Sequence, residues 1–237
     1  MSLDPRLLLS AYAAGIFPMA DSRDADELYW VEPRERAIIP LDRFHLSRSL
    51  DRTIRSDSFR VTHDTAFGQV VERCAARSET WINRDIEAAV NALHDAGHAH
   101  SIEVWRAGDL VGGLYGVTLG RAYFGESMFS LERDASKVAL AWLVARLKAG
   151  HFTLLDCQIM TPHLASLGAI SVPGSDYAAL LSAAIGSDGG GGSVGSAGAL
   201  ELPSPAFGAL DALLAVSAEG AGSPAGKVIS QFLTHTS

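Results

Sequence analysis

Polar side chains in two otherwise apolar runs are the first candidates for chemistry. Asp156 and Gln158 are two residues apart in the run LLDCQ, and Glu126 follows an apolar run that ends in Phe-Gly. Residues two apart in a strand share a face, and buried polar groups need partners. The pattern therefore predicts that Asp156 and Gln158 project together into a site. The structural alternative is that Asp156 caps the next helix or pairs with an arginine, and spacing alone favours neither.

The elements that would position these side chains lie between residues 97 and 158. Alternating apolar runs with Gly-containing turns predict strands over Ser101–Arg106, Leu110–Leu119, Ala122–Ser130 and Phe152–Ile159. A largely apolar helix over Ala135–Ala149 is expected between the last two strands, with Asp134 as its N-cap and Gly150 at its end. Strict alternation would put Glu126 on the same face as Phe124 and Met128. This order predicts an α+β fold in which a mixed sheet carries a packed helix.

Composition and spacing divide the chain into three parts. Residues 1–60 predict a small N-terminal α/β subdomain, and residues 61–182 a catalytic domain built around the mixed sheet. Further helices are expected over Leu7–Ala14, Leu46–Arg55, Ala66–Ala76 and Arg84–Ala96. Residues 183–237 form a tail rich in Gly, Ala and Ser, which we expect to be flexible. Within it, a short helix over 210–216 and a strand docking back over 228–233 are expected.

One segment of the N-terminal part is basic although the whole chain is acidic. The net charge of −8 argues against indiscriminate nucleic-acid binding, but residues 34–60 carry seven arginines against four acids. Arg48, Arg52 and Arg55 would share one face of a helix. Arginine binds phosphate bidentately, so this face suits an RNA backbone. A solvated helix face with internal Asp–Arg pairs is the alternative.

Cysteine and histidine usage points away from disulfides and metals. The two cysteines, Cys74 and Cys157, suit a reducing compartment, and no run approaches the roughly 20 apolar residues of a membrane span. His94 and His98 have the spacing of a ligand pair on a helix, but Gly97 interrupts that helix and no further ligand motif follows. We therefore expect neither a metal nor a membrane anchor.

Short motifs then connect these features to a known family. Towards the N-terminus the chain reads GIFPM, WxxPxxR, HLSRS and TWI, and further on GHAHSIEVW, LVGGLYGV, FGESMFS, DASK and DCQ, followed by HLASLGA. In this order they resemble the motifs of the bacterial leucyl/phenylalanyl-tRNA–protein transferases. The resemblance covers about residues 7 to 182 and implies a GNAT-like sheet. One departure is Thr161, where some members of that family have Asn, which leaves a polar contact open.

The resemblance also implies an activity. Such an enzyme moves Leu, Phe and less often Met from aminoacyl-tRNA to the N-terminal Arg or Lys of acceptor proteins, which marks them for N-degron proteolysis. It works in the cytoplasm without a metal or cofactor, and we expect it to be monomeric. The ester of aminoacyl-tRNA is already activated, so positioning and proton removal suffice for aminolysis.

Site roles follow from the resemblance as hypotheses. Gln158 would orient the attacking amine or polarise the ester carbonyl, Asp156 would hold Gln158, and Glu126 would stand at the mouth of the amino-acid pocket or meet the acceptor's basic side chain. The remaining assignments are an apolar pocket from Leu114, Met128, Leu143 and Leu147, adenosine contacts from Trp30 and Trp81, and tRNA contacts from Arg48, Arg52 and Arg55.

Two other functions remain as alternatives. One is a GNAT-type N-acyltransferase that uses acyl-CoA or a cell-wall peptide acceptor. The stretch from Ser130 to Ser136 lacks the Gly-rich pyrophosphate turn of such enzymes and carries two acids, which argues against acyl-CoA. The other is a non-catalytic RNA- or peptide-binding module, which would have no need for the paired Asp156 and Gln158.

Overall fold

A seven-stranded mixed sheet organises the molecule. The computed structural model describes residues 3–77, 79–186, 205–221 and 225–234. The sheet has the order β4-β5-β6-β7-β8-β3-β9, with bounds Arg60–His63, Ala99–Arg106, Asp109–Leu119, Ala122–Ser130, Leu154–Gln158, Glu35–Ile38 and Ile170–Pro173. Its neighbours are antiparallel except β7 and β8, which are parallel and joined by α5 (Ala135–Ala149). A separate two-stranded ribbon pairs β1 (Phe17–Met19) with β2 (Tyr29–Val31).

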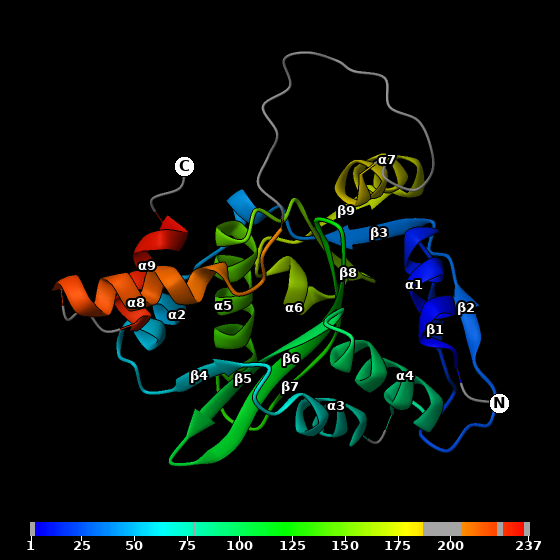
Figure 1. Ribbon diagram of the computed structural model, residues 1–237, viewed down its shortest axis with the longest axis horizontal. Helices are drawn as coiled ribbons and strands as arrows, with labels where there is room; N and C mark the ends of the chain where they lie inside the picture. Colours follow the sequence, from blue (N-terminus) through cyan, green and yellow to red (C-terminus); the bar gives the residue numbers. More distant parts are fainter. Residues whose placement is uncertain (1–2, 78, 187–204, 222–224, 235–237) are drawn as a thin grey trace.

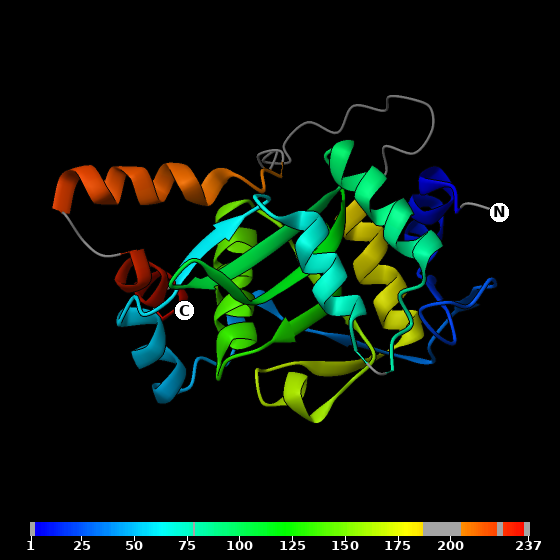
Figure 2. The same cartoon turned by 90° about the horizontal axis from the view of Figure 1, so that it is seen from below.

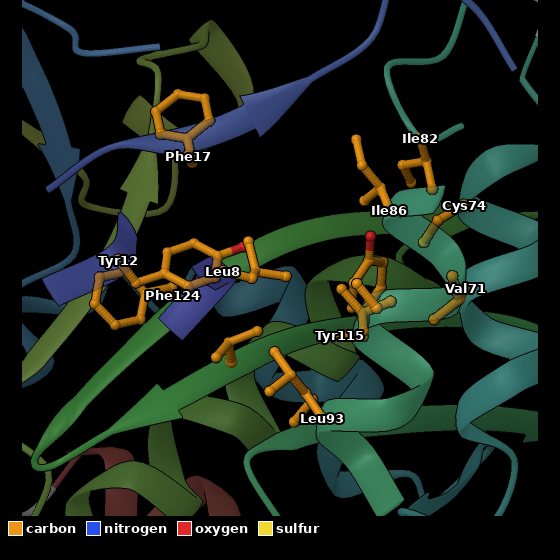
Figure 3. Packing of buried hydrophobic residues seen from close by; sticks show 14 of the residues in the cluster. Leu8, Tyr12, Phe17, Val71, Cys74, Ile82, Ile86, Leu93, Tyr115 and Phe124 are labelled. Carbon is orange, nitrogen blue, oxygen red and sulfur yellow. The ribbon is translucent and has the colours of Figure 1, made fainter. Parts of the chain in front are cut away.

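Helices cover both faces of this sheet (Figures 1 and 2). One face packs against α1 (Pro5–Ala13), α3 (Phe67–Ala75), α4 (Arg84–Asp95) and α7 (Gly174–Ile185). The other packs against α2 (Arg48–Arg55), α5, α6 (Pro162–Ala165), α8 (Ala209–Ala221) and α9 (Ala225–Thr234), with a short 3-10 turn at Leu41–Arg43. In the first core, the rings of Tyr12 and Phe124 lie 4.8 Å apart (Figure 3). The expected α+β fold is confirmed.

Helix α5 lies where the sequence predicts it but begins differently. Asp134 adopts a left-handed φ of 65° and makes no capping hydrogen bond. Instead, the Ser136 backbone N–H donates to Ser130 Oγ at 3.2 Å, while Lys137 pairs with Asp134. Asp134 thus stands at the predicted N-cap position, but its side chain does not cap the helix. Gly112 allows the first turn to approach β6, because a Cβ there would lie 2.5 Å from that of Ala135.

The N-terminal sixty residues contribute directly to the main sheet. Strand β3 lies between β8 and β9. Its residues Ala37 and Ile38 pair with Gln158 and Asp156 of β8, respectively. Helix α1 packs on the opposite face from α5. The predicted subdomain boundary after residue 60 falls inside β4, and strands on both sides of it belong to the same sheet. The division into subdomains stays a prediction from the sequence.

The C-terminal segment docks as helices. A helix over 210–216 was expected and α8 contains it, but α9 is a helix where a strand was predicted over 228–233. An apolar run such as VISQFL does not distinguish strand from helix, and here packing against α2 decides. The Gly226 backbone N–H donates to Asp57 at 2.8 Å, and the Ser230 hydroxyl donates to Asp51. The tail was expected to be flexible, and part of it, residues 187–204, lies outside the residues that the structure describes.

None of the described helices combines the length and the apolar composition that a membrane span needs.

Candidate active site

A cavity of about 400 Å³ opens beside the middle of β7 and the C-terminal end of β8. Its two sides differ because they belong to different faces of the sheet. The side facing α5 and α6 is mostly apolar, although His163 of α6 also lines the cavity; its apolar residues are Leu114, Met128, Leu140, Leu143, Leu155, Cys157 and Leu164. The side facing β1 and α3 is mixed and includes Phe17, Met19, Arg77, Trp81 and Tyr115. Glu126 and Gln158 also line the cavity, so it combines an apolar compartment with buried polar groups.

A β-bulge places Glu126 at this position. The register between β6 and β7 shifts at Tyr115, so that Gly116 pairs with Gly125 while Tyr115 pairs with Ser127. Glu126 is the extra residue, and the shift reverses the alternation of side chains beyond it. Phe124 consequently packs in the α1–α3 core and Met128 in the α5 core. The prediction that Phe124, Glu126 and Met128 share one face is wrong for this reason.

Asp156 lies beneath the cavity and forms a buried ion pair. Its carboxylate is fully buried, and Arg36, which is 1% exposed, donates to it through Nε at 3.0 Å and Nη2 at 2.7 Å. The Tyr177 hydroxyl donates at 2.8 Å, and the Gln158 backbone N–H donates at 2.7 Å. A buried charge is tolerated when it is paired and fully hydrogen-bonded, as here. Asp156 thus pairs with an arginine and also fixes the backbone of Gln158.

Gln158 ends β8 in a strained conformation that directs its side chain towards Glu126. Its φ of 63° is in the left-handed region, which non-glycine residues rarely adopt and which clusters at functional sites. The side-chain amide donates from Nε2 to Glu126 Oε1 at 2.6 Å. This leaves the amide oxygen of Gln158 free of any described hydrogen-bond partner. The glutamine can therefore present an acceptor to a ligand.

Glu126 is a buried carboxyl whose charge is finely balanced. Burial, together with the negative charge of Asp156, raises its pKa to about 7, although Tyr12, Arg36 and the Gln158 amide act in the opposite direction. Its side chain is 7% exposed. A carboxyl of this kind changes charge near neutral pH and responds strongly to a ligand cation.

The structure brings most of the predicted site residues together. Leu114, Met128, Leu143, Glu126, Gln158 and Trp81 all line the cavity. Asp156 supports it from below, whereas Leu147, one turn beyond Leu143, is fully buried in the core and is not among the lining residues. Trp30 is exposed on β2 and does not line the cavity either. Arg48, Arg52 and Arg55 are exposed on one face of α2, outside the cavity.

Sequence reasoning missed several lining residues. Phe17 and Met19 stand in the GIFPM motif, which was available as a signal, but β1 reaches the site only through the fold. Arg77 follows α3 and donates to Ser127 Oγ at 3.3 Å, with its guanidinium 5.8 Å from the Trp81 ring. His163 follows DCQ by five residues and lines the cavity from α6. Thr161 caps α6 by accepting the Leu164 N–H at 3.2 Å, a role that Asn can also fill.

The histidines of the GHAHS region have structural partners. His94 Nδ1 lies 2.8 Å from the Ala99 carbonyl oxygen, and its ring stacks on Phe67 at 4.2 Å. His100 Nδ1 lies 2.8 Å from Asp64. Within the described residues, no group of three or more His, Cys, Asp or Glu side chains is arranged to hold a metal ion.

Comparison with known proteins identifies the family. The leucyl/phenylalanyl-tRNA protein transferase model matches residues 38–182, and the model of that family's N-terminal domain matches residues 1–34. The chain belongs to the leucyl/phenylalanyl-tRNA–protein transferase family. A transferase of that name from Rhizorhabdus wittichii is 66% identical and covers 82% of this chain and 80% of the relative. Another from Novosphingobium aromaticivorans is 52% identical over 100% and 97% of the two chains. The protein is therefore an aminoacyl-tRNA–protein transferase.

Solved structures show more distant likenesses to this transferase. The crystal structure of FemX matches with a TM-score of 0.48 and 12% identity, covering 70% of this chain and 66% of that one. A GCN5-related N-acetyltransferase-like protein from Streptococcus suis matches with a TM-score of 0.32 and 14% identity, covering 70% and 63%.

Proposed function

We propose that this transferase moves leucine, phenylalanine and, less often, methionine from aminoacyl-tRNA to the N-terminal Arg or Lys of acceptor proteins. The observation that supports it best is the cavity itself, in which an apolar compartment adjoins the buried carboxyl of Glu126. An apolar aminoacyl side chain and a basic acceptor side chain would then be held in one cavity, as their reaction requires.

The aminoacyl side chain would occupy the apolar compartment. Leu114 and Met128 face each other across β6 and β7, and Leu143 of α5 closes the compartment opposite them. A methionine side chain is flexible and polarisable, so Met128 can adapt to branched, aromatic and thioether groups. No lining residue on this side carries a charge, which would disfavour polar amino acids.

The basic side chain of the acceptor would pair with Glu126. Before binding, burial holds the pKa of Glu126 at about 7, so only part of the population is charged at neutral pH. An arriving guanidinium or ammonium favours the carboxylate form and gains a charge-assisted hydrogen bond with it. The same carboxyl offers nothing comparable to a neutral acceptor side chain. Selection for Arg or Lys follows from this pairing.

Gln158 would act on the reacting atoms. During transfer, the amine nitrogen forms a bond to the ester carbonyl carbon, and the bond from that carbon to the ribose oxygen of the tRNA breaks. The Gln158 amide lies against Glu126 and can orient the amine through its free oxygen. Asp156 and Arg36 hold the Gln158 backbone in its left-handed conformation, which makes them positioning residues.

The tRNA would enter past Trp81 and Arg77. Unpaired RNA bases stack on aromatic side chains, so we place the terminal adenosine on Trp81. Trp30 lies outside the cavity, and its predicted adenosine contact would need a substrate that extends beyond it. Arg48, Arg52 and Arg55 remain candidates for the acceptor stem because they are exposed on one helix face.

The proposal includes a cellular role. Addition of Leu or Phe to a protein N-terminus would create an N-degron and commit the acceptor to proteolysis. The two free cysteines, Cys74 and Cys157, suit action in the reducing cytoplasm.

Transfer of radiolabelled Leu from Leu-tRNA to short peptides tests this function. We expect label on a peptide that begins with Arg, none on one that begins with Ala, and none after RNase treatment of the donor. Gln158→Ala should lower kcat by about 10²-fold or more, the usual scale for an oriented hydrogen-bonding group. Gln158 is preferable to Asp156 as a probe, because removing Asp156 leaves Arg36 as a buried unpaired charge and would report stability. Equal labelling of both peptides would contradict the acceptor rule.

A further inference from the structure

The proposed aminolysis releases a proton that none of the roles above accounts for. The attacking α-amine becomes positively charged as its bond to the carbonyl carbon forms, and the leaving ribose oxygen needs a proton as its bond breaks. A side chain that accepts the first proton can supply the second. The amide of Gln158 is no base, since Asn and Gln amides do not accept protons at neutral pH.

Five ionisable side chains line the cavity, and four of them are unsuited to accept this proton. They are Arg77, Tyr115, Glu126, Cys157 and His163. Arginine has no acceptor atom. Burial raises the pKa of the Tyr115 phenol and of the Cys157 thiol, so both keep their protons firmly. Glu126 already accepts the Gln158 amide and, in the proposed function, pairs with the acceptor's basic side chain.

The fifth residue, His163, has no hydrogen-bond partner at either ring nitrogen among the described residues. Its backbone carbonyl is engaged, as acceptor of the Ser166 hydroxyl at 2.7 Å. The ring is half-buried and lines the cavity together with Thr161 and Gln158, which belong to the same segment of the chain. It thus has a free acceptor nitrogen in the cavity that Glu126 and Gln158 also line.

The surroundings of His163 keep its ring in the basic form. Partial burial lowers its pKa, and the positive charge of Lys137 lowers it further. Lys137 forms an ion pair with Asp134 at 3.1 Å. The Asp134 carboxylate is therefore engaged by Lys137 and does not stabilise a protonated His163 ring. A neutral imidazole is a competent proton acceptor at physiological pH.

We propose that His163 is the general base that takes the proton from the attacking α-amine and returns it to the leaving ribose oxygen. The N–C bond forms and the C–O bond breaks, while the proton passes from the amine nitrogen to the imidazole and then to the 2′- or 3′-oxygen of the terminal ribose. No external acid, oxidant or metal is needed for this balance. The inference rests on the proposed function and adds a catalytic residue to it.

Chemical rescue of His163→Ala tests this role. We expect kcat for Leu transfer to the Arg peptide to fall by about 10²- to 10⁴-fold, with little change in KM for either substrate. Added imidazole and substituted imidazoles should restore the rate in proportion to their basicity. His98→Ala is the matched control, because His98 is exposed and outside the cavity, and its kcat should match that of the wild type.

The outcomes separate this inference from the proposed function. A His163→Ala protein that folds normally by circular dichroism and keeps kcat within about threefold overturns the inference alone. So does a loss confined to KM, or a rescue that does not follow basicity, because either would indicate binding or shape. Absence of transfer by the wild-type protein overturns the proposed function and this inference with it.

Discussion

Glu126 controls the charge of the cavity because it is buried without a full counter-charge. Arg36 lies close enough to lower its pKa, but that guanidinium is already committed to Asp156 and to the Gly15 carbonyl. The result is a carboxyl with a pKa of about 7, near which small changes in environment change its charge. Binding of a basic acceptor should therefore depend on pH in a range where ordinary carboxylates are fully ionised.

The pH dependence of acceptor binding tests this balance. Below about pH 7 Glu126 carries a proton and loses its charge, so KM for an Arg peptide should rise as the pH falls from 8 to 6. In Glu126→Gln this rise should be absent, and KM at pH 8 should be about 10- to 100-fold higher, as expected for loss of a charged hydrogen bond. Steady-state kinetics at saturating Leu-tRNA measure both effects.

Glu72→Gln is the control for this experiment, since Glu72 is an exposed acid of α3 that does not line the cavity. An unchanged KM and pH profile in Glu126→Gln would mean that the acceptor's cation binds elsewhere.

At single residues, the sequence indicated which polar side chains lie together better than it indicated their hydrogen-bond partners. The two-residue spacing of Asp156 and Gln158 was sufficient to expect them together, and the structure links them through a 2.7 Å hydrogen bond. Arg36 was visible in the basic segment, but its pairing with Asp156 joins residues 120 apart in sequence. Local periodicity carries no information about such a contact, so it left the choice between a site and an ion pair open.

Among the elements, β7 shows where a simple periodic rule fails. Its bounds agree with the prediction, yet the bulge at Glu126 reverses the side-chain faces beyond Gly125. A bulge depends on the register against the neighbouring strand, here β6, which the sequence of one strand does not specify. The strand predicted over 228–233 is wrong for a related reason: tertiary packing decides whether a short apolar run forms a strand or a helix, and here it forms α9. By contrast, α5 is long and strongly apolar, and its bounds match the prediction.

Helix α5 offers a matched pair of positions for testing the apolar compartment. Leu143 lines the cavity, whereas Leu147, one turn further on, is buried in the core. Leu143→Ala should enlarge the compartment and raise the Phe-to-Leu ratio of kcat/KM by about tenfold, within the range for one or two methylenes in an apolar pocket. Competition between Phe-tRNA and Leu-tRNA for one Arg peptide measures this ratio.

Leu147→Ala separates specificity from stability. Both substitutions remove a buried leucine and should each cost about 2–5 kcal/mol of unfolding free energy. Only Leu143→Ala should change the donor ratio. If both variants change it equally, the effect comes from movement of the whole helix, and the assignment of the compartment is wrong.

On the scale of the whole molecule, the C-terminal segment is attached to the catalytic sheet through aromatic and ionic contacts. The Phe207 ring stacks on His100 at 4.1 Å, and Arg146 of α5 donates to the Phe207 carbonyl at 2.8 Å. Arg146 also pairs with Asp211 at 2.7 Å, and α8 and α1 lie on opposite sides of α5 (Figure 1). Composition indicated a loose tail with one short helix over 210–216 and one docked segment over 228–233, but it did not predict the contacts of Phe207 and Asp211.

The ionisation of His63 should make the docking of α8 on the sheet depend on pH. His63 Nε2 lies 2.9 Å from Asp211, and its Nδ1 lies 3.4 Å from Asp64, which also contacts His100. The hydrogen bond that the protonated His63 ring donates to Asp64 raises the pKa of His63, although burial and Arg146 oppose this effect. The pair with Arg146 lowers the pKa of Asp211 against the effect of burial. The His63 contribution to stability is complete below its unfolded pKa of about 6.5 and is lost as pH rises through the raised value. The Asp211 contribution is present above about 3.9 and is lost as pH falls through the lowered value.

The docked segment should therefore be held more firmly at pH 6 than at pH 8. We expect amide protection factors in α8, corrected for intrinsic exchange, to decrease over this interval in the wild type and to change less in His63→Gln. His98→Gln, at an exposed position outside this cluster, should behave like the wild type. Since Asp211 is nearly half exposed, the pH effect should also weaken at high salt, where Arg146 remains paired but exposed charges are screened. An identical pH dependence in His63→Gln and the wild type would show that Phe207 and Arg146 alone hold the segment, with no contribution from the imidazolium.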